Sequence, residues 1–261
     1  MLTDLARACE AADGVMPFNE ATLLAIASGD VARIGDVTDD YALIAFGEAP
    51  VELAVHPDRR RHGWGRRLLE GLIAHGETRF WAHGDLPAAQ ALATVTGLHA
   101  ARTLLVLRRP VDPVDVPSLD GFTIRPSTPG DVDAVIAVNA RAFARHPEQG
   151  AMDRADFDRR AASDWFDPAG LFVAERDGRV VGFHWTKIED GIGEVYVVGV
   201  DPDQQGTGLG TALTARGLQH LVGAGVSAID LYVEGDNEPA LAVYRRLGFT
   251  EHARDVLYLL G

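Results

Sequence analysis

The fold of this chain is decided by the stretch VGVDPDQQGTGLGT at residues 198–211. It ends an apolar, β-branched run that predicts a strand over Glu194–Val200, and it leads into a predicted helix over Gly208–Gly223. Unpaired N–H groups and the helix dipole converge where such a turn enters a helix, so an anion can bind there. The glycines permit positive φ angles and a close approach of the backbone to a phosphate.

Two well-known phosphate motifs do not fit this stretch. The dinucleotide fingerprint G-x-G-x-x-G is absent, and no Gly-Lys-Ser/Thr follows as in a P-loop. The pattern that remains is Gln205-x-x-Gly208-x-Gly210. Taken alone, it also fits an ordinary glycine-rich turn between a strand and a helix.

The same pattern recurs in the first half of the chain. LAVHPDRRRHGWGRRLLEGL at 53–72 aligns with VGVDPDQQGTGLGTALTARGL at 198–218, and Arg60, Gly63 and Gly65 take the places of the glutamine and the two glycines. A second block, WAHGDLPAAQALATVTGL at 81–98, aligns with YVEGDNEPALAVYRRLGF at 232–249. The first pair of blocks is 145 residues apart and the second 151, in the same order, which indicates a duplicated domain.

The proline-containing segment RRPVDPVDVPSLDG at 108–121 separates the halves. Proline fixes φ and removes a donor, so an extended linker is expected. We therefore expect an N-terminal domain at 1–110, a linker at 111–121 and a C-terminal domain at 122–261. Each half is expected to be an α/β domain, in which helices and strands form an α+β arrangement around a mixed sheet.

The expected elements follow from hydrophobic periodicity and turn residues. In the second half, strands are expected at Phe122–Arg125, Leu171–Glu175, Val180–Lys187, Glu194–Val200, Ile229–Val233 and Val256–Leu260, with helices at Asp131–Phe143, Gly208–Gly223 and Pro239–Leu247. In the first half, helices at Leu2–Ala11 and Glu20–Ser28 precede a hairpin within Val31–Phe46.

These blocks resemble the GNAT acyltransferase superfamily, whose [QR]-x-x-G-x-[GA] loop cradles the pyrophosphate of acetyl-CoA. The downstream ending also matches, through Asn237, Ala240, Tyr244 and Gly248-Phe249. The resemblance implies two tandem GNAT domains. It further implies that the fourth strand of the fold diverges from the fifth and that pantetheine pairs with the exposed edge at Val198–Val200.

Two side chains are candidates for proton transfer. Tyr244 is expected to protonate the leaving thiolate, because the corresponding tyrosine of GNAT enzymes lies beside the sulfur; a core tyrosine is the alternative. Glu194 is expected to accept the amine proton, directly or through water; a solvated glutamate at a strand end is the alternative. The first half has Ala93 and Ala49 at these places, so the N-terminal domain is expected to be degenerate and not catalytic.

Longer strings narrow the resemblance. AFARHPEQG at 142–150, GFHWTK at 182–187 and GEVYVVGVDPDQQGTGLG at 193–210 resemble the mycothiol synthase family, tandem GNAT enzymes that acetylate the cysteinyl amine of Cys-GlcN-Ins to give mycothiol and CoA. The resemblance implies that the acceptor is bound by Glu20, Glu148, Lys187, Glu194 and Tyr232. It implies that the reacting acetyl-CoA is bound by Val198, Gly199, Val200, Gln205, Gly206, Thr207, Gly208, Leu209, Gly210, Thr211, Asn237 and Ala240. A second, non-reacting acetyl-CoA would contact Leu53, Ala54, Val55, Arg61, Gly63, Gly65 and Arg66.

The composition limits the other partners. The chain has 38 Asp and Glu against 24 Lys and Arg, a formal net charge of −14, which disfavours nucleic acid and acidic membranes as partners. The single cysteine, Cys9, excludes an internal disulfide and an acetyl-cysteine route in the second half. His56, His62 and His146 have no metal-ligand spacing, so no metal is expected. No signal peptide or membrane span is evident, and a cytoplasmic monomer is expected.

Two other functions remain open at this stage. One is a GNAT acetyltransferase for another small-molecule or peptide amine. The other is an acetyl-CoA sensor that binds the cofactor without catalysing transfer.

Overall fold

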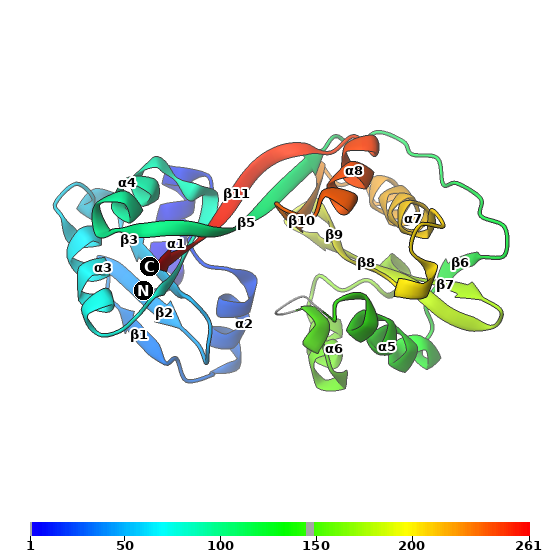
Figure 1. Ribbon diagram of the computed structural model, residues 1–261, viewed down its shortest axis with the longest axis horizontal. Coiled ribbons are helices and arrows are strands. Elements are labelled where there is room, and N and C mark those ends of the chain that lie inside the picture. Colours follow the sequence, from blue (N-terminus) through cyan, green and yellow to red (C-terminus); the bar gives the residue numbers. More distant parts are fainter. Residues whose placement is uncertain (1, 145–148) are drawn as a thin grey trace. The chain divides into compact units, whose positions relative to one another are not determined.

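The structure is a computed structural model that describes residues 2–144 and 149–261 (Figure 1). It divides into two compact units. The first comprises residues 1–105, 234–236 and 253–261, and the second comprises residues 106–233 and 237–252. The last strand of the chain therefore ends in the first unit, although the sequence pattern alone placed all of 122–261 in one domain.

The first unit is a mixed sheet with helices. Its strands run in the order β1-β2-β3-β4-β11-β5, in which β3 and β4 are parallel and β4 and β11 antiparallel. The strands are β1 (Ile34–Val37), β2 (Tyr41–Ala45), β3 (Val51–Val55), β4 (Arg79–Ala82), β5 (Leu98–Arg109) and β11 (Thr250–Leu260). The helices are α1 (Leu2–Asp13), α2 (Glu20–Ser28), α3 (Trp64–Ala74) and α4 (Pro87–Thr96).

Alternation along the strands gives this sheet an apolar surface on both faces. On one face, Leu5 and Cys9 of α1 pack with Ala42, Ile44 and Ala54. On the other face, the packed residues are Leu43, Ala45 and Val51 with Leu69 and Leu72 of α3. The sheet is therefore covered on both sides, as a parallel strand pair requires.

The second unit has the same arrangement of layers. Its strands run in the order β5-β10-β9-β8-β7-β6, and α5 and α6 lie on the face of the sheet opposite α7 (Figure 1). The strands are β6 (Thr123–Pro126), β7 (Leu171–Arg176), β8 (Arg179–Glu189), β9 (Ile192–Val200) and β10 (Ala228–Glu234). The helices are α5 (Val132–Ala142), α6 (Arg154–Ala161), α7 (Leu209–Gly223) and α8 (Glu238–Arg246).

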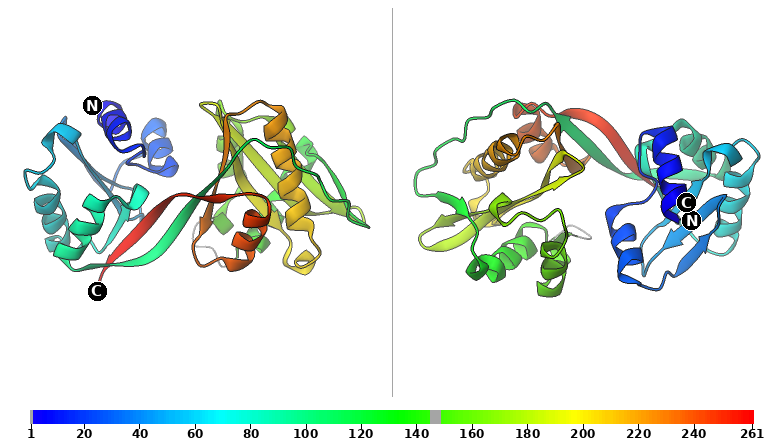
Figure 2. Two further views of the ribbon diagram at one scale, coloured as in Figure 1. Left: turned by 90° about the horizontal axis from the view of Figure 1, so that it is seen from above. Right: turned by 180° about the vertical axis from the view of Figure 1, so that it is seen from behind.

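Buried residues pack on both faces of the second unit's sheet. Beneath α5 and α6, Trp185 and Phe183 are fully buried with Val135 and Phe157. Beneath α7, Leu209 and Leu213 pack on the opposite face, where Leu119 also packs. Leu119 belongs to the extended segment 110–121, which runs along this unit to β6 (Figure 2).

The predicted fold class and elements are confirmed. The β7–β8 hairpin turns at Asp177 and Gly178, both with positive φ as a two-residue Asp-Gly turn requires. The structure adds α6 and, in the first half, β3, β4, β5, α3 and α4, none of which has a range among the elements expected from the sequence. It also accounts for most of the difference between the two repeat spacings, because α3 has 11 residues and α7 has 15.

A buried acid–imidazole–acid network joins β11 to the rest of the first unit. His83 Nε2 lies 2.6 Å from Glu52 Oε1 and His83 Nδ1 lies 3.0 Å from Asp255 Oδ2. Asp255 also accepts the N–H of Gly84 at 2.8 Å. Burial alone would lower the pKa of His83, but the hydrogen bonds and charges of Asp255 and Glu52 raise it to about 9. The imidazolium therefore compensates two buried carboxylates at neutral pH.

This network predicts that the chain loses stability in mild alkali. Because the folded-state pKa of His83 is raised above its ordinary 6.5, its contribution is complete below pH 6.5 and is lost as the pH rises through about 9. The loss is expected to be roughly 3 kcal/mol between pH 6 and 10. Urea unfolding of wild type, His83→Gln and the exposed control His75→Gln measures it. The free energy of unfolding of His83→Gln should lack this part of the pH dependence. If it varies with pH as steeply as that of His75→Gln, the assignment is contradicted.

Candidate active site

Strand β9 diverges from β10 after a short region of pairing. The parallel ladder joins residues 192–194 to residues 228–230, whereas β9 continues to Val200. On its other side β9 stays paired with β8 as far as Val200, opposite Gly182. The β9–β10 ladder therefore ends six residues before β9 does, which leaves an edge of β9 beyond the ladder. Such an edge can bind an extended ligand with amide groups as a neighbouring strand would.

The turn after β9 has the conformation of an anion site. A short 3-10 helix (Pro202–Gln204) is followed by Gln205 in an extended conformation and by Gly206 and Gly208 at φ of 79° and 88°. Residues 205–208 are exposed, and Gly208 caps the 15-residue α7 without a side-chain hydrogen bond. The first N–H groups of α7 are therefore directed to solvent at the positive end of the helix dipole.

Side chains on either side hold this turn in place. Asp201 accepts the N–H of Asp203 at 2.9 Å, and Thr207 Oγ1 donates to the carbonyl of Gln204 at 2.7 Å. Arg141 of α5 lies 3.0 Å from Asp201 Oδ1 and 2.8 Å from Asp203 Oδ2. The turn is thus preorganised, and a ligand that bound there would not have to order it.

The first unit repeats the backbone of this turn. Arg61 and Gly63 have φ of 65° and 79°, close to the values of their counterparts Gly206 and Gly208. Gly63 also caps a helix, α3, without a side-chain hydrogen bond. Strand β3 pairs with its parallel neighbour β4 over only two residue pairs, as β9 does over three. An arginine is uncommon at positive φ, so the repeat has kept the conformation at Arg61 without the residue that favours it.

Side chains occupy the end of the β3 edge in the first unit. Arg60 Nε donates to the Val55 carbonyl at 3.0 Å, and the Cys9 thiol lies 3.6 Å from the same oxygen. The Arg60 guanidinium also forms two hydrogen bonds of 2.6 and 2.7 Å with Asp13. The Arg60 guanidinium is therefore directed toward Val55 and Asp13 and not toward the space in front of the turn.

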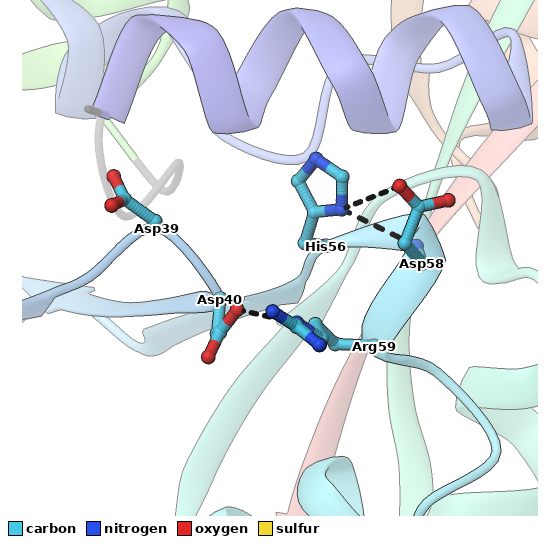
Figure 3. Close-up of a pocket in the computed structure, with 5 residues that line it drawn as sticks. All are labelled: Asp39, Asp40, His56, Asp58 and Arg59. Carbon is cyan, nitrogen blue, oxygen red and sulfur yellow. Dashed lines mark hydrogen bonds and ion pairs between the residues drawn. The ribbon is translucent and has the colours of Figure 1, made fainter.

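A hollow of about 340 Å³ lies beside the first-unit turn (Figure 3). It is lined by Asp39, Asp40, His56, Asp58 and Arg59. Arg59 Nε pairs with Asp40 at 2.7 Å, and His56 Nδ1 accepts the N–H of Asp58 at 3.3 Å. Its three carboxylates disfavour a phosphate, so this hollow is not a diphosphate site.

Glu194 lies on the face of the second-unit sheet that α5 and α6 cover. It is paired in register with Lys187 of β8, and the buried Lys187 ammonium lies 5.3 Å from the ring centroid of Trp165 in the cluster beneath these helices. Lys187 Nζ also contacts Glu189 Oε2 at 2.9 Å. Two of the residues predicted to bind the acceptor therefore lie side by side on neighbouring strands.

Tyr244 lies on α8 and packs edge-on against Phe249, with ring centroids 5.9 Å apart. Burial raises its pKa to about 12, so the phenol is protonated throughout the physiological range. At the start of the same helix, Asn237 Oδ1 accepts the N–H of Ala240 at 3.2 Å as a helix cap. The cap accounts for part of the Asn237-x-x-Ala240 spacing independently of any ligand.

The remaining predicted residues are more scattered. Tyr232, on β10, is 51% exposed, and Glu20 is the first residue of α2 in the first unit. Glu148 lies outside the described residues. Ala93, the counterpart of Tyr244, is buried on α4, so the first unit has no phenol at that place.

The structure adds residues that the sequence did not indicate. Tyr196 and Trp165 pack with ring centroids 4.9 Å apart beside Lys187, and Arg160 of α6 donates to the Tyr196 hydroxyl. Residue type alone does not distinguish an aromatic side chain in such a site from one in an ordinary core. Among residues 2–144 and 149–261, no group of His, Cys, Asp and Glu is arranged to hold a metal ion.

Comparisons with known proteins agree with this geometry. Residues 139–249 match the acetyltransferase (GNAT) family. The chain is 50% identical to a mycothiol acetyltransferase of Thermomonospora curvata, an alignment that covers 97% of this chain and 91% of that one. The chain belongs to the mycothiol acetyltransferase family. A mycothiol acetyltransferase of Clavibacter sepedonicus is 48% identical, over 97% of this chain and 89% of its own length.

Solved structures extend the likeness of fold over both halves. A GCN5-related N-acetyltransferase from Sphaerobacter thermophilus has a TM-score of 0.72 at 24% identity and covers 98% of this chain and 90% of its own. A tandem GNAT protein from the clavulanic acid biosynthesis pathway has a TM-score of 0.60 at 23% identity over 84% of this chain and 77% of its own. In the described part of the chain, none of the helices is long and apolar enough to cross a membrane.

Proposed function

We propose that this chain transfers the acetyl group of acetyl-CoA to the cysteinyl amine of Cys-GlcN-Ins, which gives mycothiol and CoA. The observation that carries the proposal is the edge of β9 beyond its ladder with β10, which leads directly into the exposed turn at 205–208 and the start of α7. Family membership over nearly the whole chain supports this acceptor.

The site fits the parts of acetyl-CoA in order. The diphosphate would accept N–H bonds from Gln205–Thr211, and the pantetheine amides would pair with Val198–Val200. The thioester carbonyl would then lie near the N–H groups of Gly199 and Val200, which can polarise it. Asn237 and Ala240, at the start of α8, complete the proposed contacts.

The proposed chemistry is a direct transfer in a ternary complex. The neutral cysteinyl amine attacks the thioester carbonyl, a C–N bond forms, and Glu194 accepts the amine proton directly or through one water. As the C–S bond breaks, Tyr244 donates its proton to the departing sulfur. Because burial raises its pKa to about 12, the phenol is protonated at neutral pH before the reaction, and the phenolate formed by the transfer regains a proton afterwards.

The acceptor would be held by charge and hydrogen bonding. Glu20, Glu148, Lys187, Glu194 and Tyr232 are the proposed contacts. Carboxylates accept bonds from the hydroxyl groups of a sugar and favour a cationic amine. The buried Lys187 next to Glu194 offers a donor to acceptor oxygens on the same face of the sheet.

A comparison of acceptors tests this function. With acetyl-CoA as donor, Cys-GlcN-Ins is expected to be acetylated far faster than an aminoglycoside or a peptide with a free N-terminus. Formation of CoA is followed with a thiol reagent after the free cysteinyl thiol of the acceptor has been accounted for. If another amine is acetylated and Cys-GlcN-Ins is not, mycothiol synthesis is rejected. If no amine is acetylated, the result favours an acetyl-CoA sensor.

Substitution of Tyr244 by phenylalanine tests the acid. Tyr244→Phe keeps the packing on Phe249 and removes the donor, so kcat is expected to fall by ~10²–10⁴. The dissociation constant of acetyl-CoA, measured by calorimetry, should stay close to that of wild type. Tyr258→Phe is the matched control, because burial likewise raises the pKa of Tyr258 to about 12 but its hydroxyl bonds to Asp85 in the first unit. Equal rates for both variants would exclude Tyr244 as the acid.

The proposal also assigns a second, non-reacting acetyl-CoA to the first unit. Its contacts would be Leu53, Ala54, Val55, Arg61, Gly63, Gly65 and Arg66. The repeated backbone at Arg61 and Gly63 supports this assignment, and the absence of a phenol at Ala93 supports a non-reacting role.

Calorimetry with acetyl-CoA is expected to give two sites per chain. Gly208→Ala and Gly63→Ala each place a side chain at a positive φ, which costs ~1–2 kcal/mol and favours another turn conformation. Each variant should weaken one site by about tenfold and leave the other unchanged. Gly223→Ala, at the far end of α7, is the control. A single site in wild type would reject the second molecule.

A further inference from the structure

A β-bulge at Tyr196 interrupts the strand that bears Glu194. Trp185 of β8 pairs with Val197, but the next residue, Thr186, pairs with Val195, so Tyr196 is the extra residue on β9. A bulge bends its strand and increases the local twist. This one follows the last β9 residue paired with β10, so it marks the point at which the two strands diverge.

The bulge also exchanges the faces of β9. A Cβ on Gly193 would meet Leu221 of α7, so the next residue, Glu194, faces the α5–α6 side. Beyond the bulge the parity is reversed, because Val198 packs beneath α7 and a Cβ on Gly199 would meet Phe183 on the α5–α6 side. A regular strand would bring Val198 to the same face as Glu194. The bulge thus allows Glu194 to face the α5–α6 side while Val198, four residues later, packs beneath α7.

The side chain of the bulged residue is held by α6. Arg160 donates to the Tyr196 hydroxyl, and its guanidinium lies 5.6 Å from the centroid of the Tyr196 ring. The ring packs edge-on against Trp165 and Trp185, at 4.9 and 5.8 Å. Arg160 is in turn held by Asp156 at 3.2 Å, and its side chain is 26% exposed. The contacts with the two tryptophans require only an aromatic ring at position 196, whereas the hydrogen bond from Arg160 requires the hydroxyl.

We propose that Arg160 is a positioning residue for the transfer: by holding the Tyr196 hydroxyl, it fixes the bulge that orients Glu194 and the β9 edge. The proposal rests on the proposed function in one respect, that Glu194 accepts the amine proton. Arg160 itself takes no part in the chemistry. It acts through Tyr196, two residues from Glu194 on the same strand.

The test compares Arg160→Gln, Arg160→Lys and Tyr196→Phe with wild type. Arg160→Gln and Tyr196→Phe are expected to lower kcat about tenfold, because small displacements of a catalytic group have effects of this order or larger. The KM for acetyl-CoA should stay within about twofold, since the turn at 205–208 is not changed. Arg160→Lys should recover part of kcat. Arg159→Gln is the matched control, because Arg159 shares the partner Asp156 at 3.0 Å and its side chain is 68% exposed.

Hydrogen exchange separates positioning from general stabilisation. Arg160→Gln and Tyr196→Phe should exchange faster at the amides of 195–200 and normally in α7, with a melting temperature near that of Arg159→Gln. Faster exchange throughout the second unit, or kcat and exchange equal to those of Arg159→Gln, would overturn the proposal. The exchange measurement requires no acceptor, so a wild-type enzyme inactive toward Cys-GlcN-Ins would reject the proposed function while the positioning of β9 is still decided.

Discussion

The divergence of β9 from β10 is the constraint on which the second unit depends. A parallel strand inside a sheet normally has its backbone groups satisfied on both sides. Here the ladder with β10 ends at residue 194, and five of the next six residues, 195 and 197–200, are paired with β8. The proposed binding edge begins where this ladder ends, and the turn that follows it leads into the N-terminus of α7. In the proposed function, strand, turn and helix together bind one long ligand that has amides at one end and phosphates at the other.

The first unit shows how much of this arrangement survives without the chemistry. It keeps the early end of the β3–β4 ladder and the positive φ angles of the turn. It also keeps a glycine, Gly63, at the start of α3, where no side chain forms a capping hydrogen bond. The side chains differ: Arg60 and Cys9 contact the carbonyl at the end of the edge, and Ala93 takes the place of the tyrosine. Backbone geometry is therefore shared between the repeats, whereas the phenol proposed as the acid, Tyr244, has no counterpart at Ala93 of the first unit.

Charge explains why the backbone has this role. A chain with a net charge of −14 has few cations to spare for a phosphate ligand, and many of its arginines are in ion pairs with its own carboxylates. N–H groups at a helix start attract an anion without adding a side-chain charge. The same excess of acid appears in the interior of the first unit, where protonated His83 compensates Glu52 and Asp255.

The sequence by itself determined the local features. It predicted the turn at 198–211, its repeat, the Asp177-Gly178 hairpin and most helices and strands of the second half, because these depend on residue type and spacing over a few positions. Only the tertiary structure decided that β11 completes the first unit's sheet, that Tyr196 is bulged and that Arg160 holds its hydroxyl. Strand register and a bulge depend on which residues of distant segments are paired, and a regular alternation of residue types is compatible with several registers. The turn at 198–211 could therefore be predicted from the sequence, whereas the orientation of Glu194 depends on strand pairing across the sheet.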